Sequence, residues 1–289
     1  MPEVPAPPDL PGLVAVIDVI APDSGLTPTG LLLLLLGAVL AGGVDAVIGG
    51  GGLVLIPLIL ALAPGLPAQV ALGTNKFSAV FGTASAGLRM ARTVQVDWQV
   101  VRLCAPLAGL CSAGGALLAA SVSSEILRPV VVVLMLTVGV FVAARPQFGR
   151  GGGGPAKDTW TAGAPHRPSP ARLVTGLLLI AAIGFYDGFF GPGTGMFLVV
   201  VFTALMSRSL IRSLAMTKLV NTATNLGGLV VFAAGGHILW LLGAALAVSN
   251  VLGAQIGAKL VLDRGTGFVR GALLVLVAVM SVKLIADML

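Results

Sequence analysis

Long apolar segments constrain this chain more than any other feature of its sequence. Runs of mostly aliphatic residues recur from position 29 to position 288, and only 10% of the 289 residues are charged. A soluble domain typically carries about 25% charged residues. Because so few charged residues cannot cover a water-soluble globule, we expect lipid to surround the chain. The expected fold class is all-α, a polytopic integral membrane protein.

The apolar runs form two groups of five, separated by a polar stretch rich in glycine and proline. A helix needs about 20 residues to span a bilayer. One run in each group is too short, and the two short runs occupy the same place in their groups. Paired, glycine-interrupted short segments point to the substrate site of a transporter. The runs lie at about 29–48, 53–63, 69–88, 98–120 and 126–144, then at 173–190, 195–206, 211–233, 238–262 and 268–288.

The two groups also align in register. A shift of 142 positions places Asp45 on Asp187 and Lys76 on Lys218, and it matches four further pairs without a gap. We interpret this as a duplication. The further pairs are Gly49 with Gly191, Trp98 with Trp240, Gly115 with Gly257 and Arg128 with Arg270. Trp98 and Trp240 each open a long run, which is typical of anchors at the membrane interface.

These features divide the chain into four parts. Residues 1–27 are expected to be an extended segment because their prolines are closely spaced, and they carry no Lys or Arg of the kind that opens a signal peptide. Residues 28–144 form the first transmembrane repeat. A cytoplasmic linker at 145–171 joins it to the second repeat, 172–289.

The positions of Lys and Arg predict the topology in the cytoplasmic (inner) membrane. If every run crosses and the N-terminus lies outside, the basic links fall on the cytoplasmic side, as the positive-inside rule requires. Five crossings in each half would make the two repeats inverted, a common plan of secondary transporters. If the short runs are re-entrant, the chain has eight crossings and parallel halves. The sequence favours ten segments but leaves eight to ten open.

Each short run follows a glycine-rich motif that begins with an aspartate. Asp45-Ala-Val-Ile-Gly-Gly-Gly-Gly-Leu precedes the first run, and Asp187-Gly-Phe-Phe-Gly-Pro-Gly-Thr-Gly-Met precedes the second. The N-terminus of a short helix offers free N–H groups and a positive dipole end to an anion. Two such loops are expected to meet near the midplane. Close helix packing by small residues is the alternative reading.

Lys76 and Lys218 lie several residues inside apolar runs. A charge at such a depth costs about 2.5–3.5 kcal/mol or more, so we expect each lysine to face a cavity or a partner. Snorkelling to the interface is the alternative. We expect Lys76→Ala to abolish anion binding and leave the fold intact. Neighbouring polar side chains could donate to an oxyanion: Thr74, Asn75, Ser78, Thr217, Asn221 and Asn225.

Asp45 and Asp187 have three open interpretations. They are candidates for proton acceptors in coupling, for partners of the buried lysines, or for caps of the broken helices.

The motifs GTNKFSAVFGTASAG and MTKLVNTATNLGG, with GAQIGAKL later in the chain, resemble the sulfite exporter TauE/SafE family. The resemblance covers about 30–288. It implies a duplicated, all-helical permease that moves sulfur-containing or related organic anions and is driven by an ion gradient. It also implies candidate site residues, which are Gly49–Gly52, Thr74, Asn75, Lys76, Gly191, Gly193 and Lys218. The sequence departs from the family pattern where Pro192 and Thr194 interrupt the second glycine run, and where Thr217 stands opposite Asn75.

The motifs therefore predict a secondary transporter of anions. The resemblance implies an exporter, with substrates such as sulfite, thiosulfate or sulfoacetate. A proton is the expected coupling ion, and a homo-oligomer is left open. A passive anion channel and a membrane partner subunit are the alternatives. No nucleophile–base constellation or metal cluster is visible, so we expect no enzyme, no metal and no other cofactor. The basic residues lie in short links between apolar runs, so we expect no nucleic-acid partner. The full substrate-site prediction is Gly49, Gly50, Gly51, Gly52, Thr74, Asn75, Lys76, Gly191, Gly193, Thr194, Thr217, Lys218 and Asn221, with Asp45 and Asp187 for proton coupling.

Overall fold

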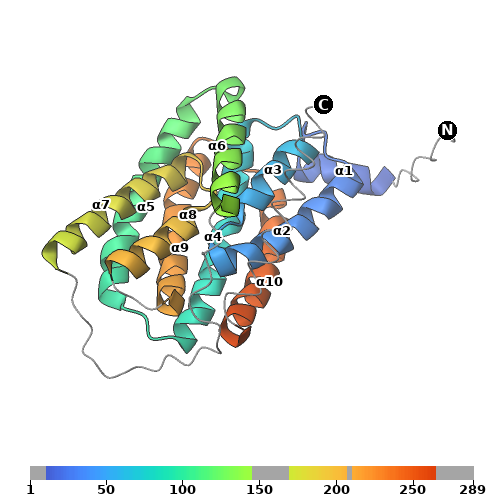
Figure 1. Cartoon of the computed structure of the whole chain (residues 1–289). Helices are drawn as coiled ribbons and strands as arrows, with labels where there is room; N and C mark the ends of the chain where they lie inside the picture. The colour runs from blue at the N-terminus through green and yellow to red at the C-terminus, as the bar shows by residue number, and fades with distance from the viewer. Residues whose placement is uncertain (1–10, 145–168, 207–209, 265–289) are drawn as a thin grey trace.

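The computed structural model describes residues 11–144, 169–206 and 210–264, and every element in these ranges is helical (Figure 1). The predicted all-α class is confirmed. By length and composition, four of the described helices can cross a membrane: α2, α5, α7 and α10. The elements are α1 Pro11–Ile20, α2 Pro28–Ile48, α3 Gly52–Leu62, α4 Ala68–Thr93, α5 Trp98–Ser121, α6 Ser124–Ala144, α7 Pro170–Phe189, α8 Thr194–Val200, the π-helical turn η1 Val201–Leu205, α9 Leu210–Ala234 and α10 Trp240–Arg264.

Three parts of the sequence prediction lie outside the described residues: the first ten residues, most of the linker and the last apolar run, 268–288.

Helix α1 corrects the prediction of an extended N-terminal segment. Residues 11–20 are helical, with Pro11 in the first position. Proline is tolerated there because the first N–H groups of a helix have no intrahelical partner. The helix buries Ile17, and the residue that follows it, Ala21, packs in the same core cluster. The prolines thus precede or begin this helix and do not interrupt it.

Helices α2 and α3 form a hairpin that returns to its starting end. Gly49 ends α2 with a φ of 82°, and its N–H donates to the Asp45 carbonyl at 2.7 Å. After α3, the Gly65 N–H donates to the Ser24 carbonyl at 3.1 Å, just before α2 begins. Helix α3 has 11 residues, or about 16 Å of helix. It is therefore too short to cross a bilayer alone.

Helix α7 forms the corresponding hairpin with α8 and η1. A side chain added at Gly176, near the start of α7, would lie 2.9 Å from the Met206 side chain, so the chain returns beside α7. Helix α8 has only 7 residues and η1 only 5. Both predicted short runs are therefore short broken helices, and each returns toward the end at which its hairpin begins.

The two hairpins open toward opposite ends of the bundle. The first opens where α4 begins and α5 ends, because the Gln69 side chain at the start of α4 donates to the Val122 carbonyl. The second opens where α9 begins, and Arg212 there bonds Gln95 in the loop between α4 and α5. The same helices therefore run from the open end of one hairpin to the open end of the other. Figure 1 shows α2 and α7 approaching the centre from opposite sides.

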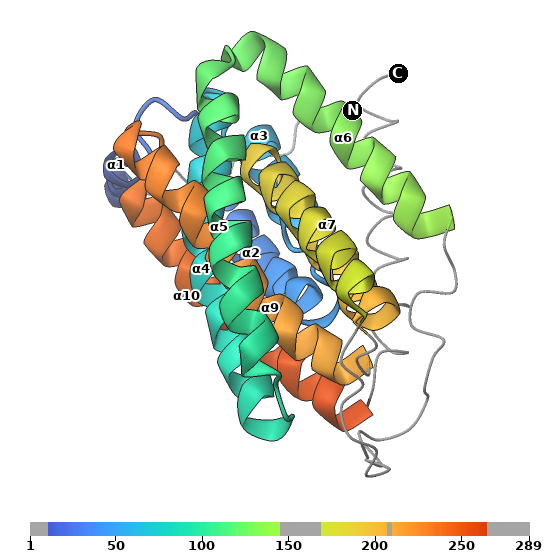
Figure 2. The same ribbon diagram turned by 90° about the vertical axis from the view of Figure 1, so that its left-hand side faces the viewer.

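The helix pairings support the predicted duplication. Helix α2 packs along α10 and α7 packs along α5, so the first helix of each half lies against the fourth helix of the other half (Figures 1 and 2). A Cβ at Gly42 would lie 2.0 Å from the Asn250 carbonyl oxygen, and one at Gly184 would lie 2.5 Å from that of Ala108. Both contacts are related by the same shift of 142 positions. Glycine permits these close approaches of two backbones.

Arg128 fixes the loop between α3 and α4. Its guanidinium donates to the carbonyl oxygens of Pro64 and Leu66, each at 2.9 Å. Hydrogen bonds from a charged group contribute about 1.5–3 kcal/mol. We expect Arg128→Ala to lower the melting temperature of the detergent-purified protein. The control is Arg102→Ala, because Arg102 is exposed on α5. Equal melting temperatures for the two variants would show that Arg128 does not hold the loop.

Candidate functional site

Two buried ion pairs join the halves of the chain crosswise. The Lys76 ammonium lies 2.5 Å from the Asp187 carboxylate, and the Lys218 ammonium lies 3.0 Å from the Asp45 carboxylate. Each lysine comes from a long central helix, α4 or α9. Each aspartate comes from the first helix of the opposite half, near the tip of its hairpin. The sequence left three interpretations of the aspartates open. The structure places both of them as partners of the buried lysines.

Both lysines are buried deep inside the bundle, which excludes snorkelling for them. The side-chain exposure is 2% for Lys76 and 0% for Lys218. Glycines make room for their stems: a Cβ at Gly228 would lie 3.3 Å from the Lys76 Cε, and one at Gly87 would lie 3.3 Å from the Lys218 Cβ. Charges without water need a partner or a ligand of opposite sign.

The ion pair also corrects the expected result for Lys76→Ala. Removing the ammonium leaves the Asp187 carboxylate buried and without its partner. Breaking such a pair is strongly destabilising. The fold is therefore not expected to remain intact in that variant.

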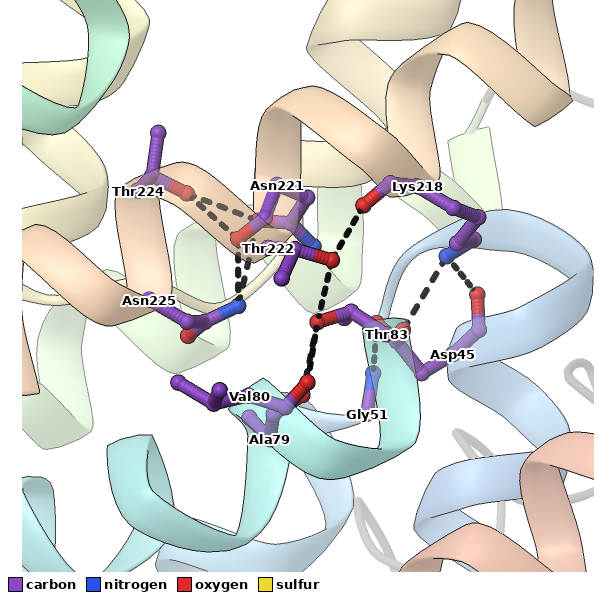
Figure 3. Close-up of polar contacts among 10 residues, drawn as sticks. All are labelled: Asp45, Gly51, Ala79, Val80, Thr83, Lys218, Asn221, Thr222, Thr224 and Asn225. Atoms are coloured by element: carbon purple, nitrogen blue, oxygen red, sulfur yellow. Dashed lines mark hydrogen bonds and ion pairs between the residues drawn. The ribbon is translucent and has the colours of Figure 1, made fainter. Parts of the chain in front are cut away.

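Among the described residues, the Lys218–Asp45 pair has further hydrogen bonds that the Lys76–Asp187 pair lacks; Figure 3 shows those around Asp45. Lys218 donates to the Asp45 main-chain carbonyl as well as to its carboxylate. The Gly51 N–H lies 3.4 Å from the second carboxylate oxygen. Since the carbonyl belongs to the last turn of α2, Lys218 also places a positive charge at the negative end of that helix.

The glycine tips of the two hairpins touch each other. The Gly195 N–H donates to the Gly49 carbonyl at 3.2 Å, and a Cβ at Gly49 would lie 2.2 Å from the Gly195 Cα. Gly52 lies beside Pro192. The predicted meeting of the two loops is therefore present. Gly191, with φ 97°, borders the Lys76–Asp187 pair, and Gly193 has φ 85°. Glycine tolerates these left-handed conformations.

The expected free N–H groups at the second broken helix are already bonded. The amides of Thr194, Gly195 and Met196 donate to the carbonyls of Gly191, Gly49 and Gly193. This part of the sequence prediction is therefore wrong in the conformation observed. At α3 the Leu53 and Val54 amides bond within the loop, whereas the Gly50 and Gly52 amides donate to no other group in the described part of the chain.

Several predicted polar ligands already have intramolecular partners. The Thr74 hydroxyl accepts from the Leu239 N–H at 3.1 Å, and the Thr194 hydroxyl donates to the Gly191 carbonyl at 2.7 Å. The Asn221 side-chain oxygen accepts from Thr224 and Asn225 (Figure 3). These contacts hold α9 and the loops in place, and a role in substrate binding stays a prediction.

Other polar groups are buried without a partner. The hydroxyls of Thr217 and Ser78 have none among the described residues, and the Asn75 side chain is 7% exposed and makes no hydrogen bond there. Buried polar atoms in proteins are normally hydrogen-bonded, so an unpaired one indicates strain, a bound water or a ligand. Thr217 and Asn75 stand at corresponding positions beside the two lysines.

The buried polar residues that sequence reasoning missed include three within long helices. Ser112 of α5 donates to the Thr224 carbonyl at 2.7 Å, Ser213 of α9 has an unpaired hydroxyl, and Asn250 of α10 is 4% exposed beside Gly82. Each of the three is a polar residue within an apolar run, and that pattern could have identified them from the sequence. Within the described ranges, no three His, Cys, Asp or Glu side chains form a group that could hold a metal.

The chain is similar to a family of membrane transporters. Residues 34–284 match the family model described as sulfite exporter TauE/SafE. The "probable membrane transporter protein YfcA" of Escherichia coli is 34% identical over 250 residues, covering 86% of this chain and 87% of its own length. A "probable membrane transporter protein" of Haemophilus influenzae is 33% identical over 244 residues, covering 84% of this chain and 90% of its own. One from Sinorhizobium is 32% identical over 260 residues, covering 89% and 93%. No solved structure matches the chain significantly.

Proposed function

This chain belongs to the sulfite exporter TauE/SafE family of membrane transporters, and from that premise we propose that it is a secondary transporter of small sulfur-containing or related organic anions. Sulfite, thiosulfate and sulfoacetate are the expected substrates, and export is the expected direction. The crossed pairs Lys76–Asp187 and Lys218–Asp45 are the observation that carries this proposal.

The crossed pairs support anion binding because each lysine already holds an anionic group at membrane depth. A carboxylate and a sulfonate or sulfite present similar oxygens to an ammonium, so a substrate anion can take the place of the aspartate. The lysine then keeps a counter-charge throughout the exchange, which avoids the cost of a bare buried ammonium. Gly50 and Gly52 flank Gly51, whose N–H donates to Asp45, and their own N–H groups bond no other described group.

The hairpin arrangement supports alternating access. The two hairpins open to opposite ends of the bundle and meet at their glycine tips. Rocking one half against the other would open a path to one side while the second hairpin closes the other side. Inverted repeats would give the two conformations closely related energies.

The charge distribution supports insertion in the cytoplasmic membrane with one end of the bundle inside, the end at which the second hairpin opens. Arg89 and Arg92 lie in the last turns of α4, and Arg172 and Arg212 lie at the starts of α7 and α9. All four belong to the end where the second hairpin opens. Because cytoplasmic loops carry an excess of basic residues, this end faces the cytoplasm.

Thermal stability across a panel of anions tests the proposal. The detergent-purified protein is heated with sulfite, thiosulfate, sulfate, sulfoacetate, acetate or chloride. A ligand that binds the native state raises the melting temperature as its concentration increases. We expect a shift for sulfur oxyanions. Flux into liposomes then separates a transporter from the alternatives, since a passive channel does not saturate and a partner subunit moves nothing alone.

Thr217→Val tests whether the unpaired hydroxyl binds the substrate. Valine has nearly the same shape, and it removes a buried hydroxyl that has no partner. We expect an unchanged or raised melting temperature without ligand, and affinity for the stabilising anion lower by about fivefold to tenfold, the value of one hydrogen bond. The control is Thr224→Val, since the Thr224 hydroxyl is bonded at 2.9 and 3.0 Å and its loss should lower stability. Unchanged anion affinity in Thr217→Val would remove that hydroxyl from the site.

A further inference from the structure

The two ion pairs are not equivalent, although corresponding residues form them. Asp187 is almost completely enclosed, with a side-chain exposure of 3%, whereas that of Asp45 is 14%. A proton from water therefore has access to Asp45 and scarcely any to Asp187. Asp45 and Asp187 both lie in the last turn of their helices, α2 and α7, so the difference reflects their surroundings and not their distance from the helix ends.

The two lysines differ in the hydrogen-bond acceptors that remain to them when their aspartate is neutralised. Lys76 has Asp187 as its one hydrogen-bond partner among the described residues. Lys218 has two acceptors on one residue, the carboxylate of Asp45 and its main-chain carbonyl. Protonating Asp187 would leave the Lys76 ammonium bare, at a large cost. Protonating Asp45 leaves Lys218 bonded to a carbonyl at the negative end of α2.

The surroundings of Asp45 contain one charged partner. Helix α9 supplies Lys218, α3 and α8 carry no charged residue, and glycines of α10 face this part of α2. The other charged groups described on the helices packed against α2 have other positions or partners. Asp18 of α1, Arg92 of α4, and Lys259 and Asp263 of α10 are exposed. Lys76 of α4 bonds Asp187, Arg89 of α4 bonds Gln255, and Arg212 of α9 bonds Gln95.

We propose that Asp45 is the carboxylate that takes up and releases the coupling proton, and that Asp187 stays ionised as the fixed counter-charge of Lys76. The proton comes from water and adds to a carboxylate oxygen of Asp45, while Lys218 remains an ammonium. Protonation of Asp45 removes the negative charge that pairs with the Lys218 ammonium. The ammonium then attracts the substrate anion. Proton uptake and anion binding thereby favour one another, so anion and proton cross together. Export then requires that the outward anion gradient exceed any opposing proton gradient. This inference rests on the proposed transport function and assigns its coupling site.

Two variants test the assignment in liposomes: Asp45→Asn and Asp187→Asn. The flux of an anion that stabilises the protein is measured with and without a pH gradient, together with exchange of labelled for unlabelled anion. We expect the gradient to accelerate wild-type flux. In Asp45→Asn the ratio of the two fluxes should fall to one while exchange persists. Asp187→Asn should keep the dependence on the gradient in whatever fraction of the protein folds.

An infrared pH titration of the purified protein provides a readout that needs no transport. Protonating a carboxylate produces a carboxylic acid C=O band. Because the chain has 11 Asp and Glu residues, the Asp45 component is isolated by subtracting the spectra of Asp45→Asn from those of wild type. That difference band should appear as the pH falls, even if Asp187→Asn does not fold. The inference is overturned if wild type and Asp45→Asn show the same carboxylic acid bands at every pH, or if wild-type flux ignores the pH gradient. If wild type moves no anion at all, the transport function itself fails, and the infrared result still decides which aspartate titrates.

Discussion

Lys76→Ala is expected to destabilise the protein by about 3–5 kcal/mol, the usual cost of removing one partner from a buried ion pair. The ammonium is 2% exposed and lies 2.5 Å from the Asp187 carboxylate. Without it, the carboxylate must either stay charged in an apolar interior or take up a proton. Unfolding of the detergent-purified variant by heat or denaturant measures the loss.

A double variant separates this cost from general damage to the helix. Lys76→Ala combined with Asp187→Ala removes both charges, and we expect it to recover most of the stability lost in the single variant. The control is Lys259→Ala, because Lys259 is exposed on α10. Anion binding should be lost in both the single and the double variant. A single variant as stable as Lys259→Ala would show that the buried pair does not hold the two halves together.

Gly49→Ala is expected to have the second large effect, because Gly49 lies at the contact between the hairpin tips. Its φ of 82° is strained for alanine by about 1–2 kcal/mol. In addition, the new Cβ would lie 2.2 Å from the Gly195 Cα. Because the atoms of Gly195 that the Cβ would meet are backbone atoms, the two tips must move apart. Overpacking of this kind typically costs about 1–3 kcal/mol more.

Gly236→Ala provides a matched control for the contact. Gly236 has a similar φ of 70°, but nothing lies within 4 Å of the position of its Cβ. It therefore carries the backbone strain without the clash. We expect Gly49→Ala to yield much less folded protein than Gly236→Ala, as measured by size-exclusion chromatography and melting temperature. Equal losses would mean that the tips are free to separate, which would argue against a tight contact between the hairpins.

The sequence predicts the helical class, the short broken helices and the residues that form the ion pairs. Composition and the spacing of apolar runs suffice for the first two, because lipid demands long apolar helices. The pairing itself does not follow from the sequence. The repeat is equally compatible with an ion pair between Asp45 and Lys76 and with one between Asp45 and Lys218. Only the packing of α2 against the opposite half decides between these two pairs.

Other features depend on contacts between distant segments. The return of α3 to the start of α2 rests on a bond between Gly65 and Ser24. The loss of free N–H groups at α8 rests partly on the Gly49 carbonyl, which lies in the other half. No local pattern contains such information. The helix at Pro11–Ile20 differs from the prediction because closely spaced prolines favour an extended chain. Pro11, however, stands at the first position of the helix, where proline is tolerated.

Anion flux in liposomes tests the central claim most directly. Purified protein is reconstituted, and uptake of a labelled sulfur oxyanion is followed across a range of concentrations, with Lys76→Ala/Asp187→Ala as the matched control. We predict saturable uptake that an ion gradient accelerates and that the double variant, although folded, lacks. Flux that rises without saturation, or uptake that is equal in the wild type and the double variant, would contradict a transport site built on the crossed lysine–aspartate pairs.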